Sequence, residues 1–158
     1  MKNINLAYII DDDEITMYLA DSIMKKVDFC EKVEKFTHGM DAINRLKFAL
    51  EVNENIPDVI IFDLNMPEMD GWEFIEEFSK LPLKKEIPAF IFTSSIDNAE
   101  LERSKEYDKI KGVIIKPLNV QKINKILRIM DMETITRPDI IFRPYNQSSF
   151  YLNFGHSM

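Results

Sequence analysis

Five short apolar runs, separated by longer amphipathic or polar segments, constrain the fold of this chain more than any other sequence feature. Continuous apolar runs of four or five residues are typical of strands buried on both faces of a parallel sheet. The clearest run is Val59-Ile60-Ile61-Phe62, and the weakest is the one from Val33 to Phe36. The predicted strands cover residues 6–10, 33–36, 59–62, 89–92 and 113–115.

The segments between these runs have helical periodicity. Ile15, Leu19, Ile23 and Val27 recur every four residues and predict the buried face of a first helix. Similar stripes predict the second, third and fifth helices: Met40, Ile43, Leu46 and Leu50; Trp72, Ile75 and Phe78; Val120, Ile123, Ile126, Leu127 and Met130. Residues 98–107 are expected to form a polar, exposed fourth helix. Strands that alternate with helices in this way predict an α/β fold, a doubly wound parallel sheet with helices on both faces.

The composition excludes several classes of protein. Twenty basic and 27 acidic residues among 158 give a net charge of −7, the opposite of the balance typical of proteins that bind nucleic acid. Cys30 is the only cysteine, so a disulfide scaffold is excluded. The apolar stretch Ile4–Ile10 is too short for a signal sequence or a membrane span. We therefore expect a cytoplasmic protein that binds neither nucleic acid nor membrane.

Polar residues follow four of the predicted strands at the point where each strand ends. They are Asp11-Asp12-Asp13, Asp63, Thr93-Ser94 and Lys116-Pro117. In open α/β sheets, ligands bind beyond the carboxyl ends of the strands. We therefore expect these side chains to meet at one edge of the sheet and to form the functional site.

The residue types at this edge favour the binding of a phosphoryl group. Asp11, Asp12 and Asp63 would repel one another, and a hard divalent cation such as Mg²⁺, which prefers oxygen ligands, would relieve the repulsion. Lys116 supplies a second positive charge and Thr93 a hydroxyl donor, and both suit phosphoryl oxygens. Asp63 is then the candidate nucleophile, which would form an aspartyl phosphate.

Four segments of the sequence, taken together, resemble the receiver domains of two-component response regulators. The matching segments, in order, are Ile9–Asp13, Asp63-Leu64-Asn65-Met66-Pro67-Glu68-Met69-Asp70-Gly71, Phe92-Thr93-Ser94 and Ile115-Lys116-Pro117. The resemblance extends over residues 4–131. It implies a flavodoxin-like (βα)5 fold with strand order 2-1-3-4-5. It also implies a receiver domain at 1–131 and a C-terminal extension at 132–158 that forms no domain of its own.

The resemblance further implies a function for the acidic residues. Asp63 looks like the phosphoacceptor, which takes a phosphoryl group from a sensor histidine kinase or a phosphotransfer protein. Asp12 and Asp63 would ligate Mg²⁺ directly, Asp11 would act largely through water, and the backbone carbonyl of Asn65 would complete the protein ligands. The protein would then signal through contacts with a downstream protein target rather than act as an enzyme.

The same resemblance implies functions for the other two strand ends. Thr93 and Lys116 would hold phosphoryl oxygens, and the Lys116–Pro117 peptide bond is expected to be cis. One position departs from the family pattern. Such receivers commonly carry Phe or Tyr three residues before the lysine, as a side chain that changes rotamer on phosphorylation. Here that residue is Val113, and a β-branched side chain cannot move between buried and exposed positions as a ring does.

Simpler structural explanations exist for two of these motifs. Asp13 or Asp12 is expected to cap the following helix, because acids are favoured at helix N-termini. Asp70 is expected to cap the third helix rather than bind a metal, while Gly71 relieves backbone strain. Neither explanation accounts for Asp63 and Lys116.

Two other functions are alternatives to a phosphorylated receiver. A phosphatase with an Asp nucleophile is disfavoured, because haloacid-dehalogenase-type enzymes place that Asp after the first strand and a second Asp two residues later. Here Asp63 follows the third predicted strand and residue 65 is Asn. A receiver that binds partners without being phosphorylated is the second alternative, although all the expected polar residues are present.

The last 26 residues are too few for an independent output domain. They are nevertheless rich in apolar residues, including Phe142, Tyr145, Phe150, Tyr151 and Phe154. Ordering such a segment costs backbone entropy and requires apolar burial. We therefore expect it to pack near the fourth helix, fifth strand and fifth helix, or to be exchanged with a second subunit in a homodimer.

Overall fold

The computed structural model describes residues 3–132, which form one five-stranded parallel sheet with five helices. The elements alternate along the chain, as the apolar runs predict. In order they are β1 (Leu6–Ile10), α1 (Glu14–Lys26), β2 (Lys32–Phe36), α2 (Gly39–Val52), β3 (Val59–Phe62), α3 (Gly71–Ser79), β4 (Ala89–Thr93), α4 (Asn98–Ser104), β5 (Ile110–Ile115) and α5 (Val120–Ile129). The strand order is β2-β1-β3-β4-β5, so the predicted fold class is confirmed.

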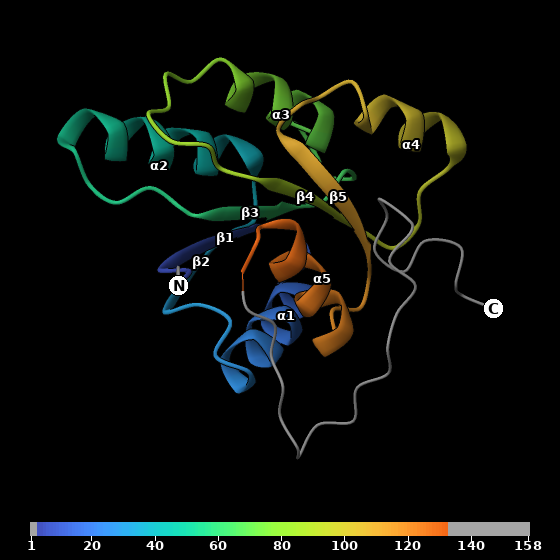
Figure 1. The fold of residues 1–158 in the computed structure, drawn as a ribbon. Coiled ribbons are helices and arrows are strands. Elements are labelled where there is room, and N and C mark those ends of the chain that lie inside the picture. Colours follow the sequence, from blue (N-terminus) through green and yellow to red (C-terminus); the bar gives the residue numbers. More distant parts are fainter. Residues whose placement is uncertain (1–2, 133–158) are drawn as a thin grey trace.

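Helices cover both faces of the sheet (Figure 1), with α2, α3 and α4 on one face and α1 and α5 on the other. Each face buries its own apolar cluster. Tyr8 and Phe62 from the strands pack with Phe74 of α3 on the first face. Ile9 and Phe92 pack with α1 and α5 on the second. The continuous apolar runs are explained by this arrangement, because successive side chains of a strand point to opposite faces and both faces are buried.

The predicted buried face of α1 is wrong. Ile15 is 71% exposed and Leu19 is 57% exposed, whereas the buried residues of α1 are Met17, Ala20, Asp21 and Met24. The buried set follows the i, i+3, i+4, i+7 pattern of a helix with 3.6 residues per turn. A strict four-residue repeat drifts around the helix axis, so only its last member, Val27, is fully buried.

Smaller differences concern element ends and faces. The fifth strand begins at Ile110 rather than 113, and the fourth helix ends at Ser104 rather than 107. In α2, Met40 is 44% exposed, and small residues such as Ala42 and Ala49 are buried instead. Alanine allows the helix to approach the sheet closely, which a count of large apolar residues does not reveal. The predicted apolar faces of α3 and α5 are confirmed as buried, except that Met130 lies just beyond the end of α5.

The expectations for residues 133–158 lie outside the described part of the chain. This applies to the packing of the C-terminal extension and to its exchange between subunits. The domain boundary at 131 stays a prediction. Between residues 3 and 132, none of the helices has the length and apolar character needed to cross a membrane.

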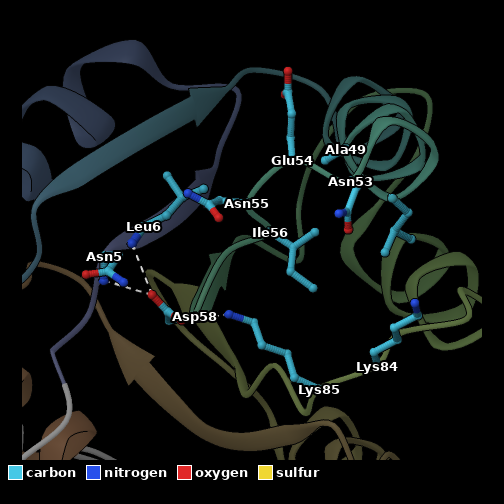
Figure 2. Close-up of a pocket in the computed structure, with 11 residues that line it drawn as sticks. Asn5, Leu6, Ala49, Asn53, Glu54, Asn55, Ile56, Asp58, Lys84 and Lys85 are labelled. Carbon is cyan, nitrogen blue, oxygen red and sulfur yellow. Dashed lines mark hydrogen bonds and ion pairs between the residues drawn. The ribbon is translucent and has the colours of Figure 1, made fainter.

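A pocket of about 290 Å³ lies at the amino ends of the strands, between the end of α2, the start of β1 and the segment that carries Lys84 and Lys85 (Figure 2). The Asp58 side chain links the start of β1 to the segment that carries Lys85. One of its carboxylate oxygens accepts hydrogen bonds from the backbone N–H groups of Asn5 and Leu6, at 2.8 and 3.1 Å, and the other is 2.7 Å from Lys85 Nζ. Burial raises the pKa of Asp58, but the bonds from Lys85 and the backbone outweigh burial and lower it.

This arrangement predicts a specific dependence of stability on pH. Because the pKa of Asp58 is lower in the folded protein, its contribution is present above the unfolded pKa of about 3.9 and is lost as pH falls through the folded pKa. Asp58→Asn should lower the free energy of unfolding by about 1–2 kcal/mol at pH 7 and by less at pH 3. Urea unfolding at both pH values measures this, with the exposed Asp108→Asn as control. Equal losses at the two pH values would contradict the assignment.

Candidate functional site

Backbone hydrogen bonds beyond the strand ends place the polar residues at the carboxyl edge of the sheet. The N–H of Asp11 donates to the carbonyl of Phe36 at the end of β2, and the N–H of Asp63 donates to that of Ile10 at the end of β1. Both N···O distances are 2.9 Å. The N–H of Lys116 donates to the carbonyl of Thr93 over 2.8 Å. The backbone of each of these residues is therefore tied to the end of a neighbouring strand.

The side chains converge as the sequence predicts. Lys116 Nζ lies 2.6 Å from Asp11 Oδ2 and 3.2 Å from Asp63 Oδ2. One carboxylate oxygen from each of Asp11, Asp12 and Asp63 lies within 4.8 Å of the others. Asp11 and Asp63 are buried, whereas Asp12 is exposed. Three carboxylates therefore face one ammonium group, which leaves an excess of negative charge at the site.

Burial and charge together set the pKa values at the site. Burial raises the pKa of Asp11 above its usual range, and the ion pair with Lys116 only partly offsets the effect. Burial alone would lower the pKa of Lys116, but its ion pair with Asp11 and the charge of Asp63 outweigh burial and raise it. Lys116 is therefore held as a cation between the two carboxylates.

Thr93 and Asn65 lie at the same edge with different contacts. The side chain of Thr93 is fully buried at the end of β4, and its hydroxyl donates to the carbonyl of Ser95 over 3.1 Å. Among the described residues, this hydroxyl makes no hydrogen bond to Asp63. The backbone N–H of Asn65 donates to Asp63 Oδ1 at 3.3 Å. The structure thus joins Asp11, Asp63 and Lys116 directly and leaves Thr93 beside them.

The two capping expectations are confirmed. Asp13 caps α1, accepting hydrogen bonds from the backbone N–H groups of Ile15 and Thr16. Asp70 caps α3 in a reciprocal arrangement with Glu73, in which each side chain accepts a bond from the other residue's backbone N–H. Capping therefore uses Asp13 and Asp70, which leaves Asp11, Asp12 and Asp63 available for the site.

The loop between β5 and α5 contains a feature that sequence analysis did not single out. The Lys116–Pro117 bond is cis, as the resemblance implies. Lys122, in the first turn of α5, is only 5% exposed, and its ammonium donates to the carbonyls of Ile115 and Pro117. A basic residue within the apolar stripe of 120–127 is the only signal for this in the sequence.

A doubly wound sheet in the order 2-1-3-4-5, with acids and a lysine at its carboxyl edge, defines a receiver-type signalling module. The family model of the response regulator receiver domain matches residues 7–128, and the chain belongs to this family.

Known proteins of similar sequence or fold agree with this assignment. A two-component response regulator from Cytophaga hutchinsonii has a TM-score of 0.73 and 27% identity, covering 82% of this chain and 96% of that one. Response regulator Rcp1 from a Synechocystis strain is 25% identical over 134 residues, which are 82% of this chain and 90% of Rcp1. The crystal structure of its Mn²⁺-bound form has a TM-score of 0.63 and covers 85% of this chain and 99% of Rcp1.

Some relatives are larger proteins with other activities. A protein-glutamate methylesterase/protein-glutamine glutaminase from Treponema denticola is 36% identical over 87 residues. The match covers 54% of this chain and only 21% of that enzyme. Receiver domains are generally signalling modules, and this chain resembles such enzymes over a small part of their length.

Proposed function

We propose that this protein accepts a phosphoryl group on Asp63 from a histidine kinase or a phosphotransfer protein, in a Mg²⁺-dependent reaction. The observation that carries the proposal is the position of the Asp63 carboxylate. It lies at the end of the central strand β3, 3.2 Å from the Lys116 ammonium and beside two further carboxylates. A nucleophile paired with a fixed cation, at the edge where α/β proteins bind ligands, suits phosphoryl transfer.

The chemistry follows from these residues. An oxygen of the Asp63 carboxylate attacks phosphorus, a P–O bond forms, and the P–N bond to the donor imidazole breaks. The Lys116 ammonium is already charged and fixed, so it can pair with the phosphoryl oxygens without reorganisation. The Thr93 hydroxyl would turn from the Ser95 carbonyl to donate to a phosphoryl oxygen.

The acidic residues fit a bound Mg²⁺ ion. The oxygens of Asp11, Asp12 and Asp63 gather within 4.8 Å, and their charge exceeds that of Lys116. Asp12 and Asp63 would hold the ion directly, Asp11 through water, and Asn65 through its backbone carbonyl. When bound, Mg²⁺ neutralises charge on the phosphoryl oxygens. The Mn²⁺ ion in the structure of Rcp1 supports a divalent ion in this family.

Intact-mass spectrometry tests the proposal directly. The protein is incubated with a small phosphodonor such as phosphoramidate, with Mg²⁺ or with EDTA. We expect a mass increase of one phosphoryl group with Mg²⁺ and none with EDTA. Absence of labelling under both conditions would support a receiver that works unphosphorylated. Turnover of a generic phosphomonoester would instead indicate a phosphatase.

Asp12→Ala should separate metal binding from folding. Because Asp12 is exposed and Asp13 caps α1, we expect weaker Mg²⁺ binding in calorimetric titration and unchanged or higher thermal stability without metal. Asp13→Ala is the matched control, and should lower the free energy of unfolding by about 0.5–2 kcal/mol as a lost helix cap. A comparable loss in Asp12→Ala would show that Asp12 acts in folding.

A kinase or phosphotransfer protein would dock beside Asp63. Ile15, Tyr18 and Leu19 are 71%, 66% and 57% exposed, and their i, i+3, i+4 spacing places them on one face of α1. The N-terminus of α1 follows directly after the acids at 11–13. An exposed apolar patch next to the phosphoacceptor suits a protein partner.

The phosphorylated protein would signal through contacts of the surface around α4, β5 and α5 with a downstream protein. Homodimerisation would be one such contact, and the protein would act in the cytoplasm. Val113 is fully buried in β5 and carries no ring, so an aromatic side chain that changes rotamer is absent at this position. A different contact links α4 to the start of α3. The Arg103 guanidinium lies 4.4 Å from the ring of Trp72, which follows Gly71 at the start of α3. In this proposal, movement of the loop between Asp63 and Gly71 is transmitted to α4 through this pair.

A further inference from the structure

We propose that Lys122 is a positioning residue for Lys116. By holding the backbone carbonyls on both sides of Lys116, it keeps that ammonium group aimed at Asp63. The inference rests on the proposed phosphorylation of Asp63 and adds a residue of α5 to the machinery.

Lys122 occupies an unfavourable position for a cation. It is 5% exposed and lies in the first turn of α5, which contains no acidic residue. The N-terminal end of a helix carries partial positive charge and disfavours a nearby cation. Burial lowers the pKa of the Lys122 ammonium. Within residues 3–132, Lys122 forms no ion pair with a carboxylate, so its charge is balanced by backbone carbonyls alone.

The carbonyls that Lys122 contacts explain its position. Its Nζ donates to the carbonyl of Ile115 at 2.5 Å and to that of Pro117 at 2.8 Å. Hydrogen bonds from a charged donor are stronger than neutral ones. The backbone N–H of Lys122 is itself held by the capping side chain of Asn119, at 2.9 Å. The start of α5 is therefore tied to the loop that carries Lys116.

These bonds complete the support of the Lys116 backbone. On the sheet side, the N–H of Lys116 donates to the carbonyl of Thr93. On the helix side, Lys122 holds the carbonyls of the residues on either side of Lys116, which are Ile115 and Pro117. With its backbone fixed, the Lys116 side chain reaches Asp11 and Asp63 at 2.6 and 3.2 Å. Misplacing a catalytic group by about 1 Å can cost up to about 10²-fold in rate.

Lysine footprinting tests this positioning without relying on phosphorylation. In Lys122→Met, which keeps the aliphatic stem but not the donors, acylation of Lys116 by a dilute amine-reactive ester should be about fivefold faster. Lys125→Met, a change at another buried lysine of α5, should leave the Lys116 rate within about twofold. Peptide mass spectrometry measures both. Equal rates in the two variants would overturn the proposal.

A double-mutant cycle then shows whether Lys122 acts through Lys116. Lys122→Met should slow phosphorylation by phosphoramidate about tenfold in the native background. In the Lys116→Met background, the same change should have less than about a twofold effect. An equal loss in both backgrounds, or no loss in the native one, would overturn the proposal.

The two experiments separate this inference from the proposed function. If the native protein is not phosphorylated, the proposed function fails while footprinting still decides whether Lys122 positions Lys116. Thermal unfolding checks each variant for folding. If Lys122→Met does not fold, Lys122→Gln, which loses the charge but keeps an amide donor, replaces it, with the same directions expected for acylation and phosphorylation.

Discussion

Asp63→Asn is expected to abolish phosphoryl incorporation, with a loss on the order of 10³-fold or more, because the amide cannot act as the nucleophile. The substitution conserves shape and leaves Lys116 paired with Asp11 at 2.6 Å. It also removes one of three clustered negative charges, so the thermal stability of the metal-free protein should be equal or higher. Intact mass after incubation with phosphoramidate and Mg²⁺ measures the loss.

Asp70→Asn is the matched control for this result. Asp70 lies in the same loop but caps α3, and asparagine is an equally good cap. This variant should therefore be phosphorylated at the native rate. If Asp63→Asn gained a phosphoryl group as fast as the native protein, the acceptor would be another residue.

Gly71→Ala is expected to be the most destabilising conservative change near the site. A Cβ at Gly71 would lie 2.5 Å from the carbonyl oxygen of Asp63 and 2.7 Å from the Cα of Leu64. Both are backbone atoms that cannot rotate away, and the Gly71 N–H already donates to the carbonyl of Leu64 over 2.9 Å. The free energy of unfolding should fall by about 2–4 kcal/mol in urea unfolding.

Gly39→Ala provides the comparison. Its Cβ would approach only side chains, nearest Met69 Sδ at 3.1 Å, at the flexible end of a methionine. Alanine is favoured over glycine by about 1 kcal/mol in a helix interior and by less at this first residue of α2, so little net change is expected. Equal losses of unfolding free energy in the two variants would contradict the assigned contact.

In Gly71→Ala, phosphorylation should also slow, because the clash displaces the backbone of Asp63.

The parallel sheet and its acidic edge could be predicted because both depend on which residues follow one another within short segments of the sequence. A strand buried on both faces must be apolar throughout, so the first polar residue after each apolar run shows where the strand ends. The carboxyl ends of parallel strands meet at one edge, which brings Asp11, Asp63 and Lys116 together without knowledge of distances. Capping by Asp13 and Asp70 follows from the few residues around each helix start.

Only the tertiary structure decided which faces are buried and which charges are paired. Ile15 and Leu19 are more apolar than Ala20 and Asp21, yet the latter pair faces the sheet, because the direction of α1 is set by its packing with the rest of the second apolar cluster. Periodicity describes a helix by itself and does not say where its neighbours lie. Lys122 illustrates the same limit. Its type and spacing suggest an exposed lysine, and only the folded loop brings the carbonyls of Ile115 and Pro117 within reach of its ammonium group.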